Sequence, residues 1–195
     1  MILLSCFHKF GHAAAVGGHR ILRLGDGTAH HDVVGAQRLG LSGGGHTYLV
    51  AGLAAGIAHA AIAGHILGLP MGYVRSGSKD HGRQNQIEGR LEPGQRVVVI
   101  EDLISTGGSV ISVVEALRDA GADVLGVVSI FTYGMQKSVD RLAAAGVQNT
   151  SLTDLDAVAQ AGVEGGYITR SDVARLLAFR DNPSDESWIN KGGID

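Results

Sequence analysis

Two adjacent carboxylates, followed by a loop of hydroxyl and glycine residues, offer the clearest chemistry in this sequence. Residues 97–109 read VVVIEDLISTGGS, so a hydrophobic run ends at Glu101 and Asp102. Carboxylates accept hydrogen bonds from neighbouring hydroxyl groups such as those of ribose. Hydroxyl donors and glycines before a helix can surround a phosphate, because the helix N-terminus presents free N–H groups. The residues after the carboxylates are Leu103, Ile104, Ser105, Thr106, Gly107, Gly108 and Ser109. The stretch therefore suits a sugar that carries a phosphate.

A simpler interpretation of the same stretch is a buried strand, a turn and a capped helix. Serine and threonine are common helix caps, which would explain residues 105–109 without any ligand. The adjacent carboxylates fit that interpretation less well, because two charges at the end of a buried strand need a partner or a ligand. The glycine spacing excludes both a P-loop and a dinucleotide-binding loop.

Strands and helices must alternate along the chain to place this stretch at the edge of a sheet. Hydrophobic runs predict strands over residues 48–51, 71–75, 96–101 and 124–131. Helices are expected over residues 54–67, 108–120 and 137–145, and near 154–161 and 171–179. Residues 76–90 are polar and contain glycine, which predicts a long loop. The alternation predicts an α/β fold, a parallel sheet covered on both faces, with ligands bound beyond the carboxyl ends of the strands.

The first 46 residues differ from the rest of the chain. Eight of the nine histidines lie in residues 1–65, and the first glutamate is Glu88. Residues 1–46 show no sustained period of a helix or strand, and their composition resembles coding sequence read in a shifted frame. We interpret them as an atypical segment, either disordered or frame-shifted, and residues 47–195 as the folded domain. No H-x-x-x-H pair of histidines lies on a convincing helix or has a carboxylate near it, so no metal site built from protein ligands is expected.

Charge and hydropathy exclude several classes of partner. The net charge of −3 gives no electrostatic reason to expect a nucleic acid. Residues 48–71 are long enough to cross a bilayer, but they are rich in alanine and glycine and contain two histidines, so we expect a buried strand and helix rather than membrane attachment. Cys6 is the single cysteine and cannot form an internal disulfide, which favours a reducing, cytoplasmic location.

Two stretches resemble motifs of a known family. Residues 101–109, EDLISTGGS, resemble the phosphoribosyl-diphosphate motif of the phosphoribosyltransferases. Residues 73–82, YVRSGSKDHG, resemble the catalytic loop of orotate phosphoribosyltransferases, with arginine, lysine and histidine spaced as R-x-x-x-K-x-H. The resemblance extends over residues 50–190 and implies a type I phosphoribosyltransferase fold.

The resemblance implies a role for each of these residues. Arg75, Lys79 and His81 would contact the diphosphate and would be the catalytic residues together with Asp102. Glu101 and Asp102 would hold the ribose hydroxyls, within a binding motif that includes Leu103 and Ile104. The segment Ser105, Thr106, Gly107, Gly108 and Ser109 would cradle the 5′-phosphate, with Ser105 also approaching orotate. Mg²⁺ would arrive on the diphosphate rather than in a protein site. Arg75 would reach the neighbouring subunit's site, which implies a homodimer with shared active sites.

The implied activity transfers ribose 5-phosphate from 5-phosphoribosyl-1-diphosphate to orotate, giving orotidine 5′-phosphate and diphosphate in pyrimidine synthesis. Residues 51–57, AGLAAGI, depart from the family: they resemble its glycine-rich diphosphate loop, but they are one residue short and lack its threonine. Two alternatives stay open. One is a phosphoribosyltransferase for another base, and the other is a protein that binds phosphoribosyl diphosphate without catalysis.

Overall fold

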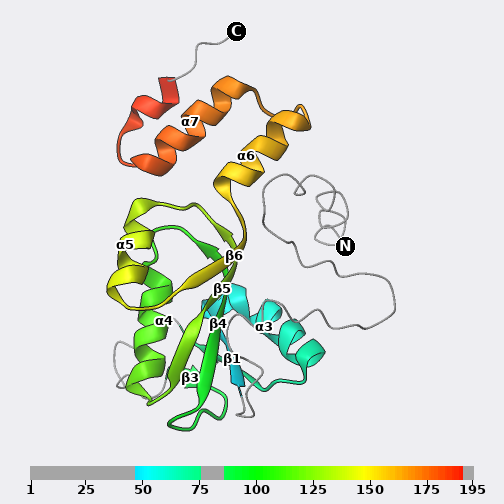
Figure 1. Cartoon of the computed structure of the whole chain (residues 1–195), viewed down its shortest axis with the longest axis vertical. Coiled ribbons are helices and arrows are strands. Elements are labelled where there is room, and N and C mark those ends of the chain that lie inside the picture. The colour runs from blue at the N-terminus through cyan, green and yellow to red at the C-terminus, as the bar shows by residue number, and fades with distance from the viewer. Residues whose placement is uncertain (1–46, 76–85, 191–195) are drawn as a thin grey trace.

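The valine run near the middle of the chain lies at the centre of a six-stranded sheet in the computed structural model, which describes residues 47–75 and 86–190 (Figure 1). The strands are β1 (Thr47–Gly52), β2 (Met71–Val74), β3 (Ile87–Glu88), β4 (Arg96–Ile104), β5 (Asp123–Thr132) and β6 (Asn149–Asp154). They lie in the order β3-β2-β1-β4-β5-β6. All pairings are parallel except that of β2 with β3. The predicted α/β fold is therefore confirmed, while the atypical segment of residues 1–46 lies outside the described residues.

Two strands were missed by the sequence analysis. The antiparallel edge strand β3 lies within residues 76–90, which were expected to form only a loop, so that expectation was wrong at Ile87–Glu88. The other edge strand, β6, has the sequence NTSLTD and alternates between half-buried and exposed positions over most of its length. An edge strand has a neighbour on one side only, and it needs no continuous hydrophobic run. Neither strand therefore carries the signal that identified the central ones.

The five predicted helices lie within a few residues of their expected positions, and a short 3₁₀ helix that was not predicted follows them. They are α3 (Leu53–Leu67), α4 (Gly108–Asp119), α5 (Gln136–Ala144), α6 (Leu155–Glu164), α7 (Arg170–Asp181) and the short 3₁₀ helix η3 (Glu186–Asn190). Figure 1 shows α3 on one side of the sheet and α4 and α5 on the other, so both faces are covered as expected. It also shows α6 and α7 beyond the end of β6. No helix in the described part of the chain is long and apolar enough to cross a membrane.

The hydrophobic core fixes β4 against α4. The side chains of Val97 and Val99 are fully buried, as is typical of a central parallel strand. The apolar face of α4 packs on them through Val110, Val113, Val114 and Leu117, which have the spacing of one helical face. This packing gives the end of β4 and the start of α4 a rigid support.

The central strand β4 is longer than predicted. It was expected to end at Glu101, but it continues to Ile104 because Leu103 and Ile104 pair with Phe131 and Thr132 of β5. The backbone N–H of Tyr133 then donates to the Ile104 carbonyl at 3.0 Å. The acidic pair therefore lies within a strand, and the connection to α4 is only the short segment 105–107.

The C-terminal helices are joined to the sheet by a row of aromatic rings. Phe131 and Tyr133 at the end of β5 make an edge-to-face contact with centroids 5.1 Å apart. Tyr133 contacts Phe179 of α7, and Phe179 contacts Trp188 of η3, at 6.4 and 5.3 Å. Such contacts favour a defined arrangement of the rings. The row thus connects the carboxyl edge of the sheet to the C-terminal segment.

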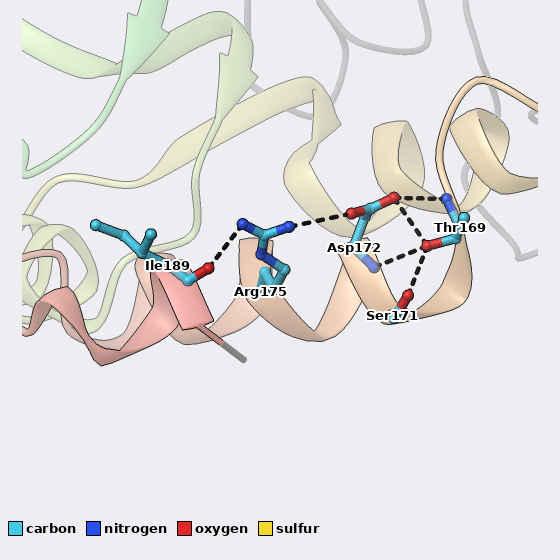
Figure 2. Close-up of polar contacts among 5 residues, drawn as sticks. All are labelled: Thr169, Ser171, Asp172, Arg175 and Ile189. Carbon is cyan, nitrogen blue, oxygen red and sulfur yellow. Dashed lines mark hydrogen bonds and ion pairs between the residues drawn. The ribbon is translucent and has the colours of Figure 1, made fainter. Parts of the chain in front are cut away.

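Polar contacts hold the C-terminal segment to α7, as Figure 2 shows. Thr169 and Asp172 form a reciprocal capping box at the start of α7. The hydrogen bonds from Thr169 hold the pKa of Asp172 below its ordinary value. One turn later, Arg175 donates to the carbonyl of Ile189 at 2.7 Å. Residues 186–190 are therefore fixed against α7 by both an arginine and an aromatic contact.

Candidate active site

The strand register brings the predicted site residues to one edge of the sheet. Gly52 of β1 pairs with Val74 of β2, and Ala51 pairs with Ile100 of β4. Residues that follow these pairs lie at the carboxyl edge of the sheet, so Arg75 and Asp102 share that edge. Carboxyl edges are where open α/β sheets bind ligands. Of the predicted catalytic residues, Lys79 and His81 lie outside the described residues.

Glu101 is buried beneath the junction of β1 and α3. Its side chain is 4% exposed, and Oε1 has no hydrogen-bond partner among the described residues. A Cβ built on Gly52 would overlap Glu101 Oε1, so a side chain at this position would require the carboxyl group to move. Burial, and to a smaller extent the nearby charge of Asp102, raises the pKa of Glu101 to about 8. Glu101 is therefore mostly protonated at neutral pH.

Asp102 is more exposed to solvent than Glu101. Its side chain is half-buried rather than buried, because successive residues of a strand face opposite sides. Leu103 is exposed, and Ile104 is buried in the core, so the side chain of Ile104 faces away from any ligand. Of the two carboxylates predicted to hold ribose, Asp102 is the more accessible one in this structure.

The β4–α4 junction, residues 105–109, presents an open helix N-terminus. Gly107 is the N-cap residue of α4, and a glycine has no side chain with which to cap the helix. No acidic residue lies in the first turn of α4. The N–H groups at such an end carry partial positive charge and suit a phosphate. Ser105 and Thr106 are half-buried and Ser109 is exposed, so none of the three predicted hydroxyl donors is fully buried in the core.

Two features of position 107 favour glycine. Its φ of 77° lies in the left-handed region, and a Cβ would lie 3.3 Å from the Cα of Ser138 on α5. The sequence analysis assigned this glycine to close approach of a phosphate, which stays a prediction, and the structure adds a backbone and a packing role. The fit of α5 against the junction was not anticipated.

Arg141 of α5 is a residue that the sequence analysis missed. Its guanidinium Nη1 donates to the Thr106 carbonyl at 2.8 Å and to Thr106 Oγ1 at 3.3 Å. No motif includes Arg141, because it lies far along the chain from the loop it contacts.

Arg75 stands at the base of the predicted catalytic loop. Its N–H donates to the Gln86 carbonyl at 2.8 Å, so residues 75 and 86 on either side of the segment 76–85 are joined. Its side chain forms an ion pair with Glu88 at 3.2 Å, with both side chains about half exposed. Exposed ion pairs contribute little, about 0–1 kcal/mol, so this pair adds little to the stability of the fold.

Comparison with known proteins identifies the family of this fold. A family model described as the phosphoribosyl transferase domain matches residues 36–162. The orotate phosphoribosyltransferase of Bacillus cytotoxicus is 54% identical over 142 residues, which are 72% of this chain and 68% of that protein. Among solved structures, the orotate phosphoribosyltransferase from Aeropyrum pernix is 30% identical and superposes with a TM-score of 0.54 over 66% of this chain and 75% of that chain.

The fold is also shared with a larger protein. The Leishmania donovani UMP synthase is 25% identical with a TM-score of 0.60, covering 74% of this chain but only 31% of that chain. Its likeness supports the fold of the described residues. From the motif match, the sequence identity and the shared fold, the chain belongs to the phosphoribosyltransferase family, within the orotate phosphoribosyltransferases.

Proposed function

We propose that this protein transfers ribose 5-phosphate from 5-phosphoribosyl-1-diphosphate to orotate, a step of pyrimidine synthesis. The bond between C1 of the sugar and the diphosphate oxygen breaks, a bond from C1 to N1 of orotate forms, and the N1 proton is released. The observation that supports the proposal is the glycine N-cap of α4, whose free N–H groups follow the Asp102 carboxylate of β4 at one edge of the sheet. The identity with orotate phosphoribosyltransferases supports the choice of base.

The proposed roles follow the charges of the reaction. The transition state is a cation-like sugar, comparable to that of glycoside cleavage, and negative charge gathers on the departing diphosphate. Asp102 would accept hydrogen bonds from the ribose hydroxyls, and the amides and hydroxyls of the β4–α4 junction would bind the 5′-phosphate. Arg75, Lys79 and His81 would bind the diphosphate, since arginine in particular suits phosphate oxygens.

Magnesium fits this site as an ion that comes with the substrate. The described residues contain no group of three His, Cys, Asp or Glu side chains that could hold a metal ion. The donors near the β4–α4 junction are the Asp102 carboxylate and the hydroxyls of Ser105 and Thr106. Such a set suits Mg²⁺, which keeps several waters and is usually bound by one or two carboxylates plus substrate phosphates. When bound, Mg²⁺ would neutralise charge on the leaving diphosphate.

The working unit is proposed to be a homodimer in the cytoplasm. The support for a dimer is the family resemblance of the segment with Arg75 and Lys79, which in that family serves the neighbouring subunit. Twofold dimers are also the commonest assembly of soluble proteins. The support for the cytoplasm is the single Cys6, which cannot form an internal disulfide.

A spectrophotometric assay of orotate consumption tests the proposal. The full chain is mixed with orotate, phosphoribosyl diphosphate and Mg²⁺, and the absorbance of orotate is followed. Orotidine 5′-phosphate should form with wild type and should fall strongly with Asp102→Asn. Parallel reactions with uracil and adenine decide the base, and turnover of either in place of orotate would overturn the assignment.

One observation favours a second candidate, a protein that binds phosphoribosyl diphosphate without turnover. Residues 51–57 were expected to resemble a shortened diphosphate loop, and in the structure β1 ends at Gly52 while α3 begins at Leu53. No loop residue therefore separates strand from helix at the point where the resemblance implies a diphosphate contact. Calorimetry that detects binding of phosphoribosyl diphosphate, combined with no product in the orotate assay, would favour this candidate.

A further inference from the structure

The β4–α4 junction is held from the α5 side by one arginine. Arg141 is half-buried, and its Nη1 lies 2.8 Å from the carbonyl oxygen of Thr106 and 3.3 Å from Oγ1 of the same residue. The same nitrogen would lie 3.2 Å from a Cβ built on Gly108. One guanidinium therefore contacts the backbone and the side chain of the residue at the centre of the junction.

The hydrogen bond to the carbonyl sets the direction of the next amide. In a trans peptide the C=O and the following N–H point in opposite directions, and no described peptide bond is cis. Because the Thr106 carbonyl points at Arg141, the N–H of Gly107 points away from α5. That amide is one of the donors at the start of α4. Arg141 thus turns it toward the side where a ligand can approach.

The hydrogen bond to the hydroxyl has a similar effect. A threonine hydroxyl has one hydrogen to donate and two lone pairs that accept. Arginine can only donate, so Thr106 Oγ1 must act as the acceptor in this contact. Its own hydrogen is then left to donate to another group. An anion beside the junction would be such a group.

A second residue of α5 supports the same arrangement. Ser138 is buried, and its hydroxyl donates to the Met135 carbonyl at 2.7 Å. Its Cα would lie 3.3 Å from a Cβ on Gly107, so the glycine rests directly on α5. Ser138 and Arg141 are three residues apart and share one face of the helix. Together they fix Thr106 and Gly107 from one side.

We propose that Arg141 is a positioning residue of the phosphate site: it fixes Thr106 so that the Gly107 amide and the Thr106 hydroxyl face the 5′-phosphate. This inference rests on the function proposed above and deepens it. Arg141 acts through Thr106 rather than by touching the substrate. Its guanidinium also adds positive charge behind the phosphate.

The test compares methionine substitutions of two arginines, each of which donates hydrogen bonds to backbone carbonyls. Arg141→Met removes the guanidinium but keeps the length of the side chain. The matched control is Arg118→Met, since Arg118 of α4 donates to the carbonyls of Ala145 and Gly146 at 2.6 and 3.3 Å, beyond the other end of α5. Calorimetry with the full chain measures affinity for ribose 5-phosphate, and thermal unfolding measures stability. Arg141→Met should weaken ribose 5-phosphate binding about tenfold or more, as expected for loss of a charged hydrogen bond, whereas Arg118→Met should leave it unchanged.

Steady-state kinetics adds a readout that a purely structural role would not change. Arg141→Met should raise KM for phosphoribosyl diphosphate and leave KM for orotate unaltered. Arg141→Lys should recover part of the affinity, because its ammonium can still donate to the Thr106 carbonyl but cannot hold both contacts in fixed geometry. If Arg141→Met does not fold, the comparison of Arg141→Lys with wild type decides.

The results of these experiments test the positioning role of Arg141 separately from the proposed activity. Unchanged affinity for ribose 5-phosphate in Arg141→Met, or equal losses in Arg141→Met and Arg118→Met, would overturn the positioning role and leave the proposed activity intact. If wild type itself binds neither ribose 5-phosphate nor phosphoribosyl diphosphate, both are overturned. Wild-type binding without orotate turnover would overturn only the activity, and the affinities of the variants would still test Arg141.

Discussion

The buried carboxyl group of Glu101 should make folding stability depend on pH in a direction opposite to that of most acidic residues. We consider the substitution Glu101→Gln, which keeps the shape of the side chain and removes its titration. In the folded protein the pKa of Glu101 is raised from 4.5 to about 8 by burial and by the charge of Asp102. In the unfolded chain the group has its ordinary pKa. Between these two values the folded state therefore holds one proton more than the unfolded state.

The sign and size of the effect follow from linkage. Below about pH 4.5 Glu101 is protonated in both states and contributes no pH dependence. As pH rises from there toward 8, the wild-type protein loses up to about 1.4 kcal/mol of stability per pH unit from this group, and the loss ends above the folded pKa. For the shift from 4.5 to about 8, the total is on the order of 5 kcal/mol at most. Glu101→Gln should not show this loss.

Urea unfolding at a series of pH values between 5 and 9 measures the effect. The useful quantity is the free energy of unfolding of Glu101→Gln minus that of wild type, because the other titrating groups cancel. This difference should rise with pH up to about 8 and then level off. Asp102→Asn serves as a control. Removing the charge of Asp102 should lower the pKa of Glu101, so the free-energy difference should stop rising at a lower pH. A difference that stays flat across the range would refute the burial argument for Glu101.

Three further substitutions test other parts of the structure. Gly52→Ala should lower the melting temperature, with a cost of about 1–3 kcal/mol, because its Cβ would overlap the buried carboxyl group; an unchanged melting temperature would contradict this packing. Arg175→Met should release η3 and shift the fluorescence of Trp188, the single tryptophan, to longer wavelength, while an unshifted spectrum would mean that the aromatic contacts alone hold it. Mixing inactive Lys79→Ala with inactive Asp102→Asn should restore roughly a quarter of wild-type activity if twofold dimers share their sites; no recovery after confirmed subunit exchange would refute shared sites.

Much of the fold could be predicted because its central strands carry a strong signal. The run at Val97 identified β4, and the spacing of apolar residues in α4 identified the helix that packs on it. The edge strands β3 and β6 carry no such signal, since one is two residues long and the other is rich in threonine and serine. The extension of β4 to Ile104 depends on its pairing with β5, which the local sequence does not encode.

The sequence predicted which residues form the candidate site, but it did not predict the contacts that hold those residues in position. The order of carboxylates, hydroxyls and glycines predicted a phosphate site at the start of a helix; α4 does begin there, after Gly107, while the phosphate contact stays a prediction. The burial of Glu101 depends on Gly52, and the position of Thr106 depends on Arg141. Both are contacts between residues far apart in the chain, so no local pattern reveals them. Roles assigned to Lys79 and His81 stay predictions.

The strand order has a consequence for how this fold can change its chemistry. After β1, the chain adds β2 and then β3 on one side of that strand. It then returns and adds β4, β5 and β6 in turn on the other side of β1. The order reverses between β1 and β4, and the helices that follow these two strands leave toward opposite faces of the sheet (Figure 1). Such a topological switch point leaves a crevice without any dedicated binding domain. Gly52 and Glu101 lie side by side at this point. We therefore expect that substitutions confined to the β1–α3 and β4–α4 junctions would change which ligand binds and leave the sheet unchanged.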